Sequence, residues 1–158
     1  MSAALLTAIL ASVAGIGTAI YLGLTATSTA MLAQHISIGI FSTMITLLAH
    51  SMMMFYFLGK AKAVREAAAE GGLSTEFERR IALARRPVFS IALLAMLVTM
   101  VTALVGASVD TGVLPTAVHT VLAYTCLALN LGALRVELNA LTESGRVVAE
   151  VNHLLRQQ

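Results

Sequence analysis

The sequence predicts an all-α fold in which four helices cross a membrane as one bundle, forming a single domain over residues 1–158. Three observations lead to this prediction. Of the 158 residues, 58% are hydrophobic and only 11% are charged, whereas about a quarter of a soluble domain is charged. The mean hydropathy is +0.88. Four apolar segments are also long enough to cross about 30 Å of hydrocarbon at about 1.5 Å per residue.

The four spans are expected at about 3–25, 31–58, 88–107 and 116–134. The first resembles a secretory signal only in its position, because no Lys or Arg precedes it and its apolar run is longer than a signal needs. We therefore expect a retained first helix. Its Gly15 and Gly23 belong to a face of small residues, which lets helices in lipid pack closely and favours association between copies of the chain.

The positive charges predict the topology. All ten Lys and Arg residues follow Gly59, and seven of them lie in the middle loop, residues 59–87. The connections 25–30 and 108–115 contain none. By the positive-inside rule the middle loop and both termini are cytoplasmic, most simply at a bacterial inner (plasma) membrane. The formal charge of +2 then reflects topology, and no nucleic-acid partner is expected.

The middle loop is expected to form a helical hairpin. Residues 60–70 are strong helix formers that continue the second span beyond the bilayer, and Gly71 ends them. Thr75 and Glu78 match a capping box that would begin a new helix, 76–86, ahead of Pro87. The tail, 135–158, is amphipathic and would either lie on the membrane surface or pack on the hairpin. This cytoplasmic hairpin is a candidate docking surface for a protein partner.

Three histidines are the candidate functional residues within the spans: His35, His50 and His119. Ionisable side chains inside a membrane are costly and usually functional. No Asp, Glu, Lys or Arg is expected deep in a span, which argues against a proton-coupled pump. His35 and His119 begin spans that run in the same direction, so both should lie near the outer face. Two such imidazoles on facing helices can ligate the iron of haem b.

Other roles for this pair remain open. Met31 lies one turn before His35 and offers a thioether, which would serve as an alternative axial ligand or complete a copper site with the two imidazoles. Each histidine would instead be structural if it only made a hydrogen bond to a neighbouring helix.

The stretch HSMMMFYF begins at His50 and lies at the inner interface. His50 should be about 22 Å from His35 along the helix axis. A quinone head group would fit here, with His50 or Tyr56 hydrogen-bonding a carbonyl, although aromatic residues also form ordinary interface belts. The fourth span offers no ligand near Leu134, so a second haem is not expected. Asn130 should make an interhelical hydrogen bond.

With His35 and His119 in this layout, and His50 in its HSMMMFYF stretch, the chain resembles the small four-helix membrane b-type cytochromes and the haem-bearing membrane anchors of respiratory dehydrogenases. The resemblance extends over the span layout. It implies electron transfer between a quinone pool and a partner, with His35 and His119 as the haem ligands. Two alternatives are a non-catalytic subunit or anchor of a larger complex, and a membrane protein that binds copper or another metal. No motif assigns a catalysed reaction.

Overall fold

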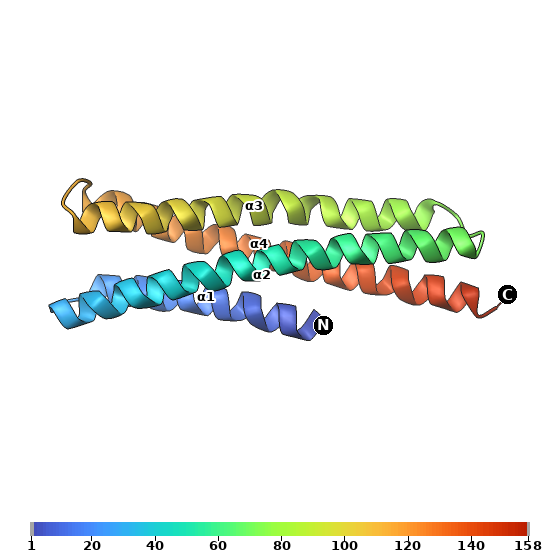
Figure 1. Cartoon of the computed structure of the whole chain (residues 1–158), viewed down its shortest axis with the longest axis horizontal. Helices are drawn as coiled ribbons and strands as arrows, with labels where there is room; N and C mark the ends of the chain where they lie inside the picture. Colours follow the sequence, from blue (N-terminus) through green and yellow to red (C-terminus); the bar gives the residue numbers. More distant parts are fainter. Residues whose placement is uncertain (1, 158) are drawn as a thin grey trace.

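The computed structural model describes residues 2–157, and they form four helices joined by short connections (Figure 1). The helices are α1 (Ser2–Thr25), α2 (Thr29–Glu70), α3 (Glu76–Asp110) and α4 (Thr116–Leu155). All four are long and apolar enough to cross a membrane. The prediction of an all-α chain with four such helices is therefore confirmed.

The helices form an elongated bundle with two different ends (Figure 1). The connections 26–28 and 111–115 lie together at one end, which we call the short-loop end. The turn 71–75 and the C-terminus lie at the other. Because α1 begins near the middle of the bundle, only three helices continue beyond it. We call this three-helix part, residues 59–70, 76–87 and 135–155, the stalk.

The observed helix boundaries agree with the predicted ones for α2 but differ from them for α3. As expected, α2 is continuous over 42 residues, and Gly72 follows it with φ of +60°, a conformation that glycine adopts readily. In contrast, α3 runs through Pro87 without a break. The predicted cap by Thr75 is wrong, because that side chain makes no capping bond; Ser74 instead accepts a hydrogen bond from the main-chain N–H of Glu76.

Two apolar clusters hold the bundle together. The first lies at the level where all four helices are present and contains Leu5, Ile9, Ala49, Met53, Phe57, Val88 and Ala140. The second lies in the stalk and contains Val64, Phe77, Ile81, Val147 and Val151. In this second cluster Val147 and Val151 of α4 thus pack against residues of α2 and α3. Arg80 adds ion pairs to Glu143 and Glu150, at 2.8 and 2.6 Å.

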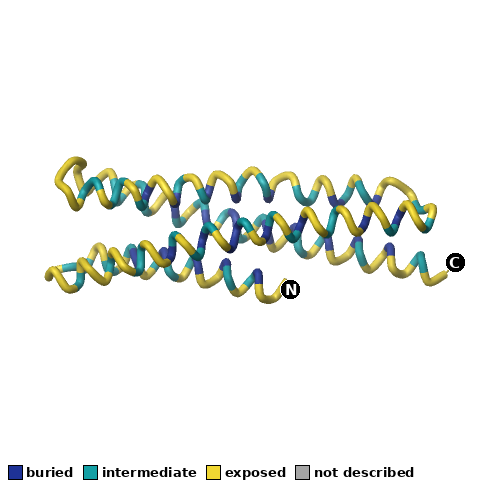
Figure 2. The backbone as a smooth tube through the Cα atoms, in the orientation of Figure 1, coloured by how far each residue is buried: buried dark blue, intermediate teal, exposed yellow. Residues whose placement is uncertain are grey.

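Burial is uneven along the bundle (Figure 2). Buried positions are concentrated in the middle and in the stalk, whereas no residue in 20–41 or 103–125 is buried. The outward faces carry large exposed apolar side chains, including Phe41, Phe55 and Leu104. Such faces are expected where helices meet lipid.

Candidate functional site

His35 of α2 and His119 of α4 meet at the short-loop end of the bundle. Their ring centres are 6.0 Å apart, and the ring planes are inclined at 80°. The two residues are separated by more than eighty positions in the sequence and approach because α2 and α4 run in the same direction. The two rings therefore lie at one level of the bundle, and their depth in a membrane stays a prediction.

The ring of His35 is held by α1. Its Nδ1 atom lies 2.8 Å from the main-chain oxygen of Ala19, so Nδ1 carries the hydrogen and donates it to that carbonyl. Nε2 is left without a hydrogen bond within residues 2–157. The ring also lies close to Gly23, where a Cβ would come within 2.9 Å of the ring Cε1 atom. Only glycine lets the ring approach α1 so closely.

The ring of His119 is held by α3 in a similar way. It lies against Gly106, where a Cβ would again come within 2.9 Å of Cε1. The main chain of Thr102, one turn before Gly106, lies beside the ring. The Nδ1 atom of His119 is buried but has no hydrogen-bond partner among the described residues. Thus each histidine rests on a glycine of the preceding helix, with a main-chain group four residues earlier beside it.

The donor set at this site is small. Within residues 2–157, no group of three or more His, Cys, Asp or Glu side chains is placed to hold a metal ion. Met31, the additional candidate, has its Sδ atom 3.5 Å from the Thr27 hydroxyl, which donates to it. Two imidazoles can provide both axial ligands of a haem, because the macrocycle supplies the other four nitrogens. A bare copper ion would need further donors from the chain or from solvent.

A second polar cluster surrounds His50, toward the stalk. His50 is 1% exposed, and both of its ring nitrogens are engaged by α4. Nδ1 lies 2.8 Å from Oε1 of Glu137, and Nε2 lies 3.0 Å from Oδ1 of Asn130. Asn130 therefore makes the interhelical hydrogen bond that its polarity predicts. Its amide nitrogen also donates to the Cys126 carbonyl and the Thr99 hydroxyl, at 2.9 and 3.2 Å.

Glu137 is the residue that sequence reasoning missed. The fourth span was expected to end at 134, which assigned Glu137 to the amphipathic tail, and no role was assigned to its side chain, which is 1% exposed. The prediction that no residue near Leu134 supplies a second haem ligand stays a prediction, but Asn130 and Glu137 do place polar groups of α4 level with His50. The available signal was the seven-residue spacing from Asn130, which places both side chains on one face of α4. They lie on either side of the level of Leu134 and enclose the His50 ring.

Tyr56 has a different environment from His50. It is half-buried, packs against the middle apolar cluster, and lies edge-on to Phe57 at 5.7 Å between ring centres. The Lys60 ammonium lies 5.3 Å from the centre of its ring. The proposed quinone contacts of His50 and Tyr56 remain a prediction, and any such contact to His50 would replace one of its two hydrogen bonds to α4.

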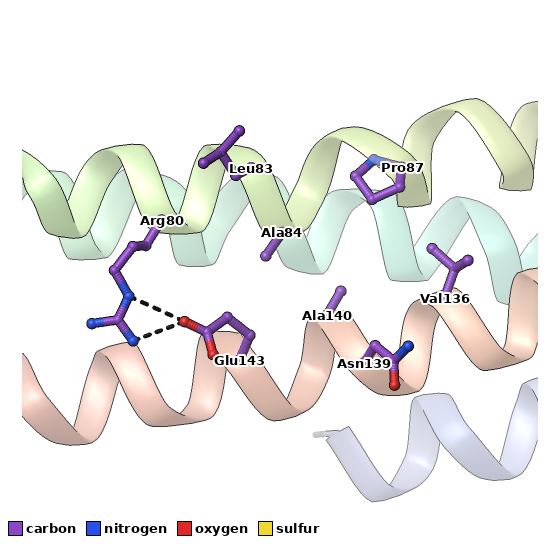
Figure 3. Close-up of a pocket in the computed structure, with 8 residues that line it drawn as sticks. All are labelled: Arg80, Leu83, Ala84, Pro87, Val136, Asn139, Ala140 and Glu143. Carbon is purple, nitrogen blue, oxygen red and sulfur yellow. Dashed lines mark hydrogen bonds and ion pairs between the residues drawn. The ribbon is translucent and has the colours of Figure 1, made fainter.

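An open groove of about 390 Å³ lies between α3 and α4 in the stalk (Figure 3). Its lining is Arg80, Leu83, Ala84, Pro87, Val136, Asn139, Ala140 and Glu143. The Arg80 guanidinium donates two hydrogen bonds to Glu143, at 3.1 and 2.8 Å. These two charges neutralise each other across the groove, so we assign no ligand to it. Both histidine sites lie elsewhere in the bundle.

Comparison with known protein families, with characterised proteins and with solved structures found no match to this chain.

Proposed function

We propose that this chain is an integral membrane protein that binds one b-type haem between His35 and His119 and passes electrons through it. The observation that carries the proposal is the 6.0 Å separation of the two ring centres. Two imidazoles that bind one metal ion through bonds of about 2 Å have ring centres roughly 6 Å apart. The structure brings the rings from α2 and α4 to this separation.

The surroundings of the His35 ring suit a haem ligand. A metal-binding histidine usually donates its other ring N–H to a carbonyl or carboxylate, which fixes the tautomer and the ring orientation. His35 does this with the Ala19 carbonyl and keeps Nε2 free. The incomplete protein cover over residues 20–41 and 103–125 supports a large planar group in this part of the bundle. An apolar macrocycle there would bury surfaces that protein side chains leave uncovered.

The proposed function requires that the four helices lie in a lipid bilayer. The four apolar helices provide the spans, and all Lys and Arg residues lie in the stalk except Arg156, which directly follows it. We place the stalk and both termini in the cytoplasm and the histidine pair near the outer face, most simply of a bacterial inner membrane. When bound, haem iron supplies one-electron chemistry. The chain holds it through His35 and His119, and α1 and α3 fix the orientation of those rings.

A second candidate function, the membrane subunit of a larger complex, is favoured by the stalk. Its three helices are fastened by an apolar cluster and by the ion pairs of Arg80, so it forms a firm projection. It extends beyond the part of the bundle where all four helices are present, which leaves its sides open to a protein partner. Such a subunit would also bind haem if both proposals hold. A copper site with Met31 and a quinone near Tyr56 are further proposals with less support.

The test is the absorption spectrum of the detergent-purified chain, oxidised and after dithionite. Four proteins are compared: wild type, His35→Ala, His119→Ala and the matched control His153→Ala, whose histidine is exposed on the tail. We expect a Soret band with sharp reduced α and β bands in wild type and control, and their loss in the first two variants. A well-folded, colourless wild type would overturn the haem proposal; stoichiometric copper would then favour the metal-site alternative.

A further inference from the structure

The His50 cluster is not used by the proposed haem site, and it contains one incompletely satisfied group. The Oε2 atom of Glu137 is buried and has no hydrogen-bond partner among the described residues. Its other oxygen, Oε1, forms a hydrogen bond with the Nδ1 atom of His50. An unpaired carboxylate oxygen in an apolar interior is costly, because it has lost its hydration without gaining a donor. Such a group needs a physical explanation.

The hydrogen atoms around His50 follow from the orientation of Asn130. The Asn130 amide nitrogen faces two acceptors, the Cys126 carbonyl and the Thr99 hydroxyl. Its Oδ1 atom must therefore be the one that faces His50, an assignment made from the hydrogen-bond network. An oxygen in that position accepts only, so the Nε2 atom of His50 carries a hydrogen.

One proton then occupies the 2.8 Å contact between His50 Nδ1 and Glu137 Oε1. It belongs either to an imidazolium beside a carboxylate or to a neutral imidazole beside a carboxylic acid. Both arrangements have no net charge. This suits the neighbouring turns, which bury Met53 on α2 and Ala133 and Ala140 on α4. Loss of that proton would leave a carboxylate with neither oxygen bonded to a donor, and this is the least favourable state.

We propose that His50 and Glu137 form a proton-binding site inside the bundle, which takes up one further proton at Oε2 of Glu137. The site begins as an imidazolium beside a carboxylate, and the added proton comes from the aqueous phase and bonds to a lone pair of the carboxylate atom Oε2. No covalent bond breaks and no electron moves. The product is a neutral carboxylic acid beside an imidazolium, with a net charge of +1. Release of the proton restores the neutral pair.

The buried pair of His50 and Glu137 forms no ion pair with any other charged side chain among the described residues. Within residues 2–157, His50 is the group that forms an ion pair with Glu137. The helix α1 contributes no Asp, Glu, Lys, Arg or His over residues 2–25. The other titratable or charged side chains nearest along these helices are Tyr56 and Lys60 on α2, Arg85 and Arg86 on α3, and Cys126, Arg135 and Glu143 on α4. None of these forms an ion pair with Glu137 among the described residues.

Infrared spectroscopy of the purified protein tests the site directly. Spectra are recorded in steps from pH of about 8 to about 4, a range that includes ordinary imidazole and carboxyl titrations. In wild type we expect the C=O stretch of a protonated carboxylic acid to grow as the pH falls, at a frequency typical of an apolar environment. This band should be absent from Glu137→Gln and should shift in Glu137→Asp, which keeps the carboxyl.

The matched control is Glu150→Gln, on the same helix but exposed and paired with Arg80. It should keep the band. Identical titrations of wild type and Glu137→Gln would overturn the proposal, and so would loss of the band in the control alone. If Glu137→Gln does not fold, the Glu137→Asp variant tests the proposal instead: a shifted band supports the proton site, and an unshifted band overturns it. The measurement needs no haem, so a colourless protein with this band would reject the haem proposal and retain the proton site.

Discussion

Gly106 forms the surface on which the ring of His119 lies, because a Cβ at position 106 would come within 2.9 Å of the ring Cε1 atom. Gly23 has the same relationship to His35. Contacts this short require either the ring or the helix to move. The two glycines therefore set the positions of the two imidazoles, although neither glycine carries a functional group.

The substitution Gly106→Val is expected to displace the His119 ring and abolish the haem spectrum, with an overpacking cost of about 1–3 kcal/mol. Gly23→Val should do the same to His35. The controls are Gly17→Ala and Gly39→Ala, because a Cβ at either position would meet nothing within 4 Å. Absorption spectra and unfolding in mixed detergent measure both effects. A normal spectrum in Gly106→Val would show that the glycine does not position the ring.

The pairing of His50 with Glu137 predicts strongly coupled substitutions. Removing one partner of a buried pair costs about 3–5 kcal/mol, whereas replacing both with apolar residues costs far less. We therefore expect His50→Leu and Glu137→Leu each to be much less stable than wild type, and the double variant to be more stable than either. Free energies of unfolding for the four proteins give the coupling. Additive costs would contradict the pairing.

The proton site also predicts how the reduction potential depends on pH. One-electron reduction of a haem held by His35 and His119 would add a negative charge there, about 27 Å along α4 from Glu137. At an effective dielectric of about 20, this charge strengthens proton binding at Glu137 roughly threefold. The potential should therefore fall by about 30 mV in total as the pH rises through the titration of the pair. A redox titration should show this fall in wild type and lose it in Glu137→Gln, but an equal fall in both proteins would refute the coupling.

The first turn of α3 predicts a small acid sensitivity. Glu76 accepts two hydrogen bonds from Arg79, each 2.8 Å long, and these bonds lower the pKa of Glu76 from its ordinary value of 4.5. A lowered carboxyl pKa stabilises the fold above 4.5, and the contribution is lost as the pH falls through the lowered value. Thermal unfolding should show wild type slightly more stable than Glu76→Gln near neutral pH and equal to it in strong acid. A constant difference at every pH would exclude this origin.

The fold was largely predictable from the sequence because each span is a long, almost uncharged run. The relative level of His35 and His119 was predictable for the same reason, since two spans in the same direction place equivalent positions at one depth. The local errors have local causes. Ser74 rather than Thr75 accepts the first N–H of α3, and tertiary packing keeps α3 helical through Pro87.

The candidate site was predictable only in part. The supporting roles of Gly23 and Gly106 depend on how closely two helices approach each other. The spacing of apolar residues along the sequence does not give this distance. Glu137 was assigned to the tail because hydropathy places the end of a span at the first charged residues, here Arg135. The burial of Glu137, which follows Arg135, can be predicted only when its partner on α2, His50, is known. Long-range pairing, separated by 87 positions, is the information that the sequence pattern lacks.

The haem content of the purified wild-type chain, compared with that of the variant His35→Ala/His119→Ala, tests the proposed haem site most directly. Haem and iron are quantified per polypeptide, and the coordination of the iron is determined by electron paramagnetic resonance. We expect one haem per chain, low-spin and bound by two imidazoles, in wild type and none in the double variant. Equal haem in both proteins, or a folded wild type that takes up no haem when it is supplied, would contradict the account.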